Sequence, residues 1–118
     1  MLSLCEWLGK HLIIAKGECK VKTYTICGSM RFQTEMQEIA FELETKNGYN
    51  ILQCAYCDSG RVLTMEELEH LADAHYQKID MSDGIYVVNI GGYIGESVRN
   101  EIVYAQYRGK EVVYHENK

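Results

Sequence analysis

The chain lacks most of what a nucleic-acid-binding or membrane protein needs. Its 118 residues hold 12 lysines and arginines against 17 aspartates and glutamates, a net charge of −5, and no basic stripe that could neutralise phosphates. No stretch reaches the roughly 18 apolar residues that a membrane span requires. Proline is also absent, and no function follows from that absence. We therefore expect a protein that binds neither a nucleic-acid polymer nor a membrane.

The N-terminal segment is a poor secretion signal. Residues 2–15 are partly apolar, but Glu6, Lys10 and His11 interrupt them and no basic start precedes them. The sequence therefore predicts a cytoplasmic protein.

Residues 1–20 follow no clear pattern and could form a helix or an edge strand. Residues 21–118 are expected to form one domain, long enough to bury a core of its own.

The five cysteines do not make a disulfide framework, since they are odd in number and scattered along the chain. Cys54 and Cys57 form the single C-x-x-C pair, but they close a predicted strand, whereas a thioredoxin-like redox pair opens a helix. A zinc site would need a second pair of ligands, and none of the four histidines supplies one convincingly. We expect structural cysteines in a reducing compartment, with no metal or cofactor. Metal or redox use of the pair is the less favoured alternative.

From residue 21 onward, apolar strand-like runs alternate with segments of helical periodicity. Strands are expected at residues 24–27, 49–56, 85–89 and 111–114, and helices at about 32–46, from 65 onward, and 97–108. This alternation predicts an α/β fold: a doubly wound parallel sheet in a three-layer sandwich, flavodoxin-like or Rossmann-like, with four or five strands. Numbered along the chain, the strands are expected in the order 2-1-3-4.

Two turns follow central strands of the predicted sheet, and both would open onto the same crevice. The first begins at Gly28, where a missing side chain permits close approach of the backbone, and continues with Ser29 and Arg31. These two side chains could bind a phosphate or a carboxylate. The alternative is a tight turn between strand and helix with Arg31 in solvent.

The second turn runs from Gly91 to Ser97 and leads into a helix. Ser97 and Glu101 are four residues apart and therefore share a helix face. A helix N-terminus favours an ionised carboxylate, which a nucleophile or base needs. Tyr93 could stack on a nucleobase or pack across the turn. The alternative for Glu101 is an ordinary surface glutamate.

Three motifs together resemble the nucleoside 2-deoxyribosyltransferase superfamily. They are Cys27-Gly-Ser-Met-Arg31, Ser82-Asp83-Gly-Ile-Tyr-Val-Val-Asn89, and Glu101-Ile-Val-Tyr-Ala105 after the glycine turn. In pattern they are most similar to the 2′-deoxynucleoside 5′-monophosphate N-glycosidases. The resemblance covers about residues 22–115. The last motif is moderately specific, and the first is weak by itself.

The resemblance implies that Glu101 attacks C1′ of a ribose or deoxyribose and releases the base. The resulting glycosyl-enzyme ester would be resolved by water or by a second base. It further implies a small-molecule substrate, a nucleoside or nucleotide, and a homodimer or larger homo-oligomer in which a neighbouring chain completes the pocket. The predicted substrate-binding residues are Gly28, Ser29, Arg31, Asn89, Tyr93, Gly95 and Ser97.

The predicted second catalytic residue is His75. The family carries an aspartate near the end of the helix before the third strand, and this position falls at or near His75, with Asp73 and Asp80 close by. His75 could act as a general acid, or it could be a structural histidine. Two alternatives to an enzyme stay open: a non-catalytic nucleotide-binding module on the same fold, and a flavodoxin-like binding or signalling domain. A second titratable group within reach of Glu101 would favour the enzyme over the binding module.

Overall fold

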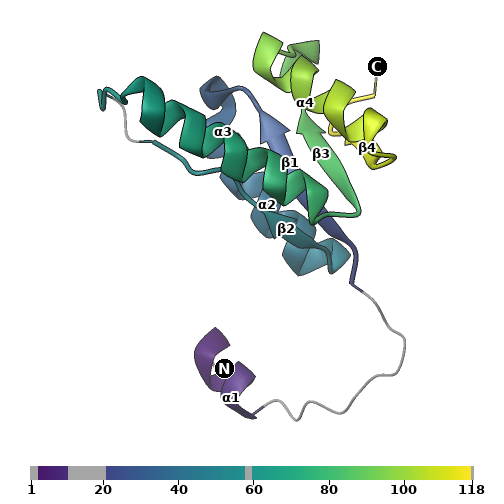
Figure 1. Ribbon diagram of the computed structural model, residues 1–118. Coiled ribbons are helices and arrows are strands. Elements are labelled where there is room, and N and C mark those ends of the chain that lie inside the picture. Colours follow the sequence, from purple (N-terminus) through teal and green to yellow (C-terminus); the bar gives the residue numbers. More distant parts are fainter. Residues whose placement is uncertain (1–2, 11–20, 58–59, 118) are drawn as a thin grey trace.

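A four-stranded parallel sheet forms the centre of the molecule (Figure 1). The computed structural model describes residues 3–10, 21–57 and 60–117. The strands are β1 (Thr23–Gly28), β2 (Asn50–Leu52), β3 (Gly84–Val88) and β4 (Glu111–Tyr114), and their order is β2-β1-β3-β4. All three neighbouring pairs are parallel. The predicted fold class and strand order are confirmed.

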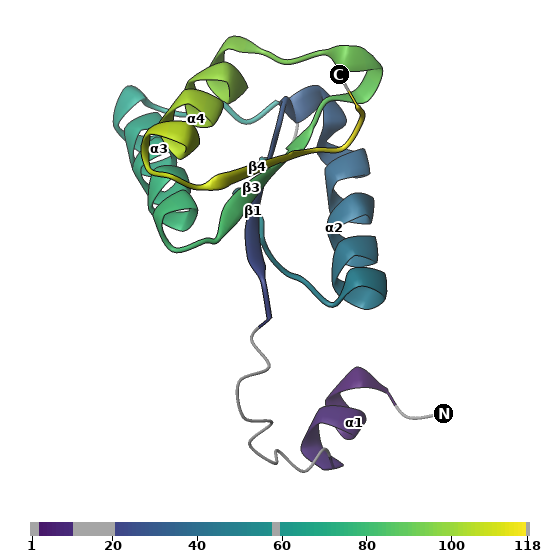
Figure 2. The ribbon, with the colours of Figure 1, turned by 90° about the vertical axis from the view of Figure 1, so that its right-hand side faces the viewer.

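Helices cover both faces of the sheet, as Figure 2 shows. Helix α2 (Gln33–Asn47) lies on one face, and α3 (Met65–Asp80) and α4 (Glu96–Tyr107) lie together on the other. Short 3-10 turns, η1 (Met30–Phe32) and η2 (Ile90–Gly92), follow β1 and β3. Helix α1 (Leu4–Lys10) belongs to the N-terminal extension, and the rest of that extension up to residue 20 lies outside the described residues. No described helix is both long and apolar enough to cross a membrane.

The central strands β1 and β3 contribute to two separate cores because alternate residues point to opposite faces. Ile26 and Val88 pack with Met36 of α2 on one face, whereas Cys27 and Val87 pack beneath α3 and α4 on the other. The near-continuous apolar runs of these strands therefore follow from burial on both faces. This arrangement fixes Cys27 on the α3–α4 side, directly before the first turn.

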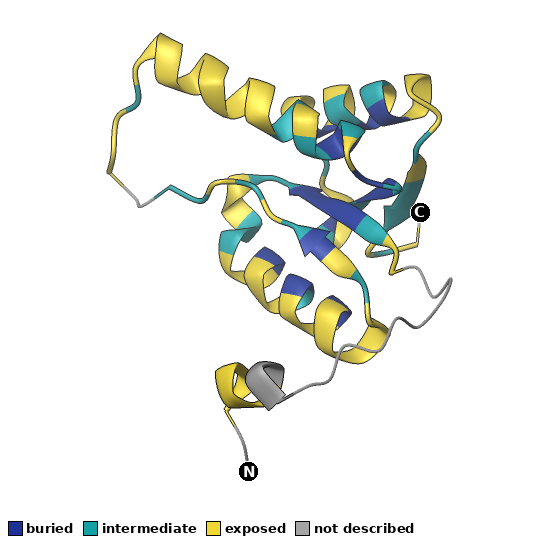
Figure 3. Cartoon of the chain, turned by 60° about the horizontal axis from the view of Figure 1, so that its bottom comes forward, coloured by how far each residue is buried: buried dark blue, intermediate teal, exposed yellow. Residues whose placement is uncertain are grey.

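Helix α3 begins at a capping box, as its sequence predicts. The Thr64 side chain accepts a hydrogen bond from the backbone of Glu67, and the Glu67 carboxylate accepts one from the backbone of Thr64. Residues 65–74 of the helix are all exposed, and Ile79 is its only buried residue (Figure 3). The first turns of α3 therefore extend past the sheet and leave a space between this helix and the ends of the strands.

Strand β2 is shorter than predicted. It covers Asn50–Leu52, whereas the sequence predicted a strand over residues 49–56. β2 is an edge strand that pairs only with β1. The chain can therefore leave the sheet after Leu52 without breaking hydrogen bonds to a second strand. The Gln53 carbonyl instead accepts a hydrogen bond from the Lys78 side chain at 2.8 Å. As a result, Cys54 and Cys57 lie in a loop beneath α3.

Candidate active site

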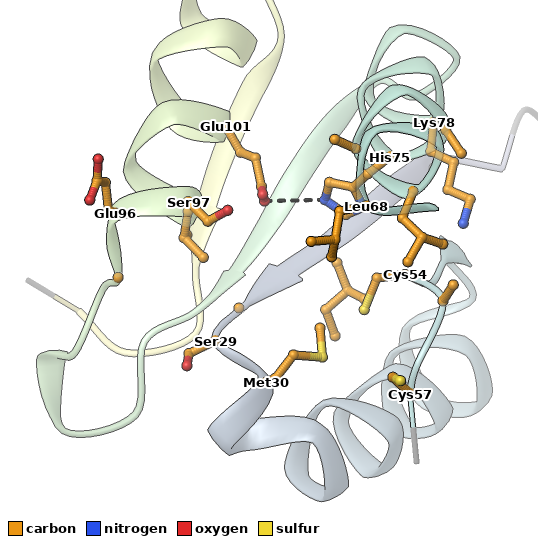
Figure 4. A pocket seen from close by; sticks show the side chains of 18 of the residues that line it. Ser29, Met30, Cys54, Cys57, Leu68, His75, Lys78, Glu96, Ser97 and Glu101 are labelled. Atoms are coloured by element: carbon orange, nitrogen blue, oxygen red, sulfur yellow. Dashed lines mark hydrogen bonds and ion pairs between the residues drawn. The ribbon is translucent and has the colours of Figure 1, made fainter. Parts of the chain in front are cut away.

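A cavity of about 430 Å³ lies at the carboxyl edge of the sheet, between the α3 and α4 helices and the loop after β2 (Figure 4). This edge is where open α/β sheets bind ligands. The volume falls in the ~300–1,000 Å³ range usual for small-molecule sites. Its walls are mixed, with apolar side chains from α3 and its preceding loop, and polar groups from the two turns.

Glu101 projects from α4 into this cavity (Figure 4). Its side chain is 13% exposed, and Oε1 lies 3.1 Å from Nε2 of His75 on α3, which is also 13% exposed. Glu101 is therefore a mostly buried carboxylate with a specific partner, and the surface alternative is wrong. An ionised carboxylate only accepts hydrogen bonds, so the Nε2 nitrogen of His75 carries the proton. The other ring nitrogen, Nδ1, is buried and has no hydrogen-bond partner among the described residues.

Cys27 is a third member of this cluster and was not predicted as a site residue. Its Sγ lies 3.4 Å from Nε2 of His75. Burial, reinforced by the negative charge of Glu101, raises the pKa of the Cys27 thiol well above its ordinary value. The group is therefore a neutral thiol at neutral pH. The sequence offered one signal, the position of Cys27 at the end of a central strand directly before Gly28.

Most of the predicted binding residues line the cavity. Gly28 and Ser29 approach it from the end of β1, and Gly95 and Ser97 approach it from the start of α4. The first turn of α4 has no side-chain cap, since Gly95 occupies the N-cap position. Its free backbone N–H groups therefore face a space that could hold an anion or a sugar hydroxyl.

Three predicted residues do not line the cavity. The guanidinium of Arg31 stacks on Tyr93, with its central carbon 3.8 Å from the ring centre. The buried side chain of Asn89 donates to the Glu116 carbonyl at 3.1 Å and accepts from the Glu116 N–H at 2.8 Å. Asn89 thus fastens the C-terminal segment to the end of β3, while Arg31 and Tyr93 fasten the two turns to each other.

Several lining residues were not predicted as site residues, some on segments outside the motifs and others, such as Met30 and Glu96, inside the two turns. Lys78 and Glu96 bring charge to the cavity, and Cys54 and Cys57 enter it because the chain leaves the sheet after Leu52. Lys78 already donates to the Gln53 carbonyl. Apolar lining comes chiefly from Met30, Leu63, Leu68, Leu71 and Ala72.

Comparison with known proteins assigns neither a family nor a function to this chain. No protein-family model, no curated protein and no solved structure matches this chain. The likeness to nucleoside 2-deoxyribosyltransferases therefore depends on the three motifs alone. A function for the chain has to be argued from the cavity and from the residues around Glu101.

Proposed function

We propose that this chain cleaves, or transfers a base at, the N-glycosidic bond of a nucleoside, a deoxynucleoside or its 5′-monophosphate. The observation that carries the proposal is the mostly buried Glu101 carboxylate, held 3.1 Å from His75 at the wall of the cavity. Catalytic groups are commonly found as such convergent polar side chains in an otherwise apolar pocket.

In this mechanism Glu101 is the nucleophile. A carboxylate oxygen forms a bond to C1′ of the sugar while the bond from C1′ to the base nitrogen breaks. The bonding electrons leave with the base, which takes up a proton. The sugar remains on Glu101 as an ester until water or a second base attacks C1′ and restores the carboxylate.

His75 has a positioning role in this mechanism. Its Nε2–H donates to Oε1 of Glu101, so Oε2 is the oxygen left to attack C1′. The base departs from the sugar face opposite the nucleophile, whereas His75 contacts the nucleophile directly. A general-acid role, as predicted from the sequence, would require the ring to reach the departing base. The hydrogen bond to Glu101 instead supports orientation of the carboxylate, which strongly affects rate because small displacements of reacting groups are costly.

The cavity walls suit the two halves of a nucleoside. The apolar side chains of α3, among them Leu68 and Leu71, offer a surface for a flat heteroaromatic base. Ser29, Ser97 and the free N–H groups at the start of α4 offer donors for sugar hydroxyls or for a 5′-phosphate. The sugar would then span the space between these donors and Glu101.

The proposal is preferred to a non-catalytic binding module because of His75. The sequence argument made a second titratable group within reach of Glu101 the discriminating feature, and His75 meets that condition at 3.1 Å.

A panel assay tests this function. The purified chain is incubated with the common ribonucleosides, deoxynucleosides and their 5′-monophosphates, and free base is measured by chromatography, with and without a second free base as acceptor. We expect base release or exchange from at least one member. A chain that bound a nucleotide but released base from none would support the binding module.

A further inference from the structure

Three ligand-type atoms from three elements converge beside the cavity, which His75 and Glu101 line and from which Cys27 is buried. The Sγ of Cys27 on β1, Nε2 of His75 on α3 and a carboxylate oxygen of Glu101 on α4 all lie within 4.8 Å of one another. Nothing in the proposed glycosidic reaction uses a thiol at this place. The cluster therefore calls for an explanation of its own.

Two of the three separations are close to those of a tetrahedral zinc site, and the third, from Sγ of Cys27 to the Glu101 oxygen, is at most 4.8 Å. Zinc bonds of about 2.3 Å to sulfur, about 2.0–2.1 Å to nitrogen and about 2.0–2.2 Å to oxygen place neighbouring ligand atoms roughly 3.3–3.6 Å apart. The observed Sγ–Nε2 distance is 3.4 Å and the Nε2–Oε1 distance is 3.1 Å. An ion at the centre thus requires shifts of only a few tenths of an ångström along these two edges.

The charges of the cluster also suit a divalent ion. Cys27 as a thiolate, Glu101 as a carboxylate and His75 as a neutral imidazole carry a total charge of −2. A bound divalent cation would make the buried cluster neutral. A coordinated thiol loses its proton to solvent, because the ion supplies the missing counter-charge.

The histidine can change its tautomer for a metal without breaking a hydrogen bond on its far side, although the Nδ1–H so formed finds no acceptor among the described residues. Coordination through Nε2 moves the ring proton to Nδ1, which has no hydrogen-bond partner among the residues that the structure describes. No existing bond at Nδ1 is broken by this change. The hydrogen bond from Nε2 to Glu101 is replaced by two bonds to the shared ion.

We propose that Cys27, His75 and Glu101 bind Zn²⁺ in an open site with three protein ligands and a fourth position facing the cavity. Thiolate and imidazole ligands select zinc and similar transition ions over Mg²⁺ and Ca²⁺, which prefer sets of oxygen ligands. Because Glu101 would be engaged by the ion, Zn²⁺ inhibits base release. That inhibition rests on the proposed function, whereas the metal site itself does not.

The test is a titration of the metal-free full chain with Co²⁺, followed by displacement with Zn²⁺. We expect one ion per chain, the intense visible bands of tetrahedral Co²⁺ and a sulfur-to-cobalt charge-transfer band, all lost when Zn²⁺ is added. Cys27→Ser and His75→Gln should each weaken binding at least ~100-fold, since each removes one of only three ligands. Cys57→Ser is the matched control, because Cys57 lines the same cavity outside the cluster, and it should bind as the parent chain does.

Cys27 is fully buried, so a substitution there can prevent folding. The charge-transfer band of the unmodified chain is therefore the second readout, because it requires no variant. A missing charge-transfer band would overturn the proposal. So would Co²⁺ binding that survives Cys27→Ser but is lost in Cys57→Ser, because the ion would then sit on the C-x-x-C pair. The titration uses no substrate, so a failed metal site leaves the base-release assay unaffected, and an inactive enzyme leaves the titration unaffected.

Discussion

Glu101 and His75 come from different helices and are 26 residues apart, yet their side chains are hydrogen-bonded to each other. Spacing within α4 is enough to place Glu101 on the face of Ser97, toward the strand ends. Nothing in the spacing within α3 says that His75 will face α4, because that depends on how the two helices pack together. The placement of the carboxylate at this edge was therefore predictable from spacing, whereas its role as a nucleophile was inferred from the resemblance and stays a prediction, and its partner was predictable only through the resemblance.

The positioning role of His75 can be separated from a proton-transfer role by two substitutions. His75→Leu removes the donor to Oε1 and should lower kcat/KM for base release by ~10²-fold, the size expected when a reacting group is misplaced. His75→Gln keeps an N–H donor of similar reach and should recover most of that loss. Equal losses in the two variants would contradict positioning and favour proton transfer by the imidazole.

Arg31 is the residue through which the preference for phosphate can be tested. Its guanidinium lies on the Tyr93 ring beside the turn that carries Ser29, and it can leave that ring for a stronger, charge-assisted bond to a phosphate. Arg31→Ala should weaken binding of 5′-monophosphates by about 1.5–3 kcal/mol, roughly the strength of a hydrogen bond to a charged group. Binding of nucleosides should change little. Calorimetric titration of both ligands checks this, and an equal loss for both would mean that Arg31 only fastens the two turns.

Among the elements, the pairing of β3 with β4 requires a close approach between Gly84 and the backbone of Glu111. A Cβ atom at Gly84 would lie 2.5 Å from the Glu111 backbone oxygen, so no side chain fits at the start of β3. The same requirement does not hold at Gly95, where the nearest atom to a Cβ would be the Tyr93 hydroxyl at 3.5 Å. Strand pairing at this edge therefore constrains the sequence more than the turn into α4 does.

We predict that Gly84→Ala lowers the free energy of unfolding by about 1–3 kcal/mol, as expected for overpacking against rigid backbone. Gly95→Ala serves as the control and should cost less, about 0.5–1 kcal/mol, because alanine is less favourable than glycine at the N-cap. Urea unfolding followed by circular dichroism measures both. Equal stability of the two variants would mean that β4 is free to move away from β3.

The elements themselves were largely predictable. The burial of β3 on both faces could be predicted from the apolar run at residues 85–88. The capping box of α3 could be predicted from Thr64 followed by Glu67. The early end of β2 could not be predicted, because an apolar, strand-like sequence continues past the point where the edge strand leaves the sheet. For that reason Cys54 was assigned to a strand, although it lines the cavity.

At the scale of the whole molecule, an apolar patch lies uncovered on the outer surface of α3 and α4. Val103 is 64% exposed and Tyr107 is 84% exposed, and they border a shallow hollow shared with Tyr76 and Tyr104. Exposed tyrosines beside aliphatic side chains are typical of interfaces between proteins. We propose that this face joins two copies of the chain. The resemblance implies a homo-oligomer, but it does not point to this face.

This assembly is tested by sedimentation or light scattering at tens of micromolar. We expect a dimer for the parent chain and a monomer for Val103→Glu, because a charge in the middle of an apolar interface is costly to bury. Phe41→Glu is the control, since Phe41 is similarly exposed on α2 at the opposite face. A parent chain that is monomeric, or a Val103→Glu variant that stays dimeric, would rule out this face.

The central claim is that the carboxylate of Glu101 captures the sugar. Glu101→Gln keeps the shape of the side chain and its hydrogen bonding but removes the charge that attacks C1′. On the substrate found by the panel assay, we predict that base release falls by at least ~10³-fold in this variant, while calorimetry still detects ligand binding through the turns. A Glu101→Gln chain that released base at the rate of the parent chain would contradict the mechanism proposed for this site.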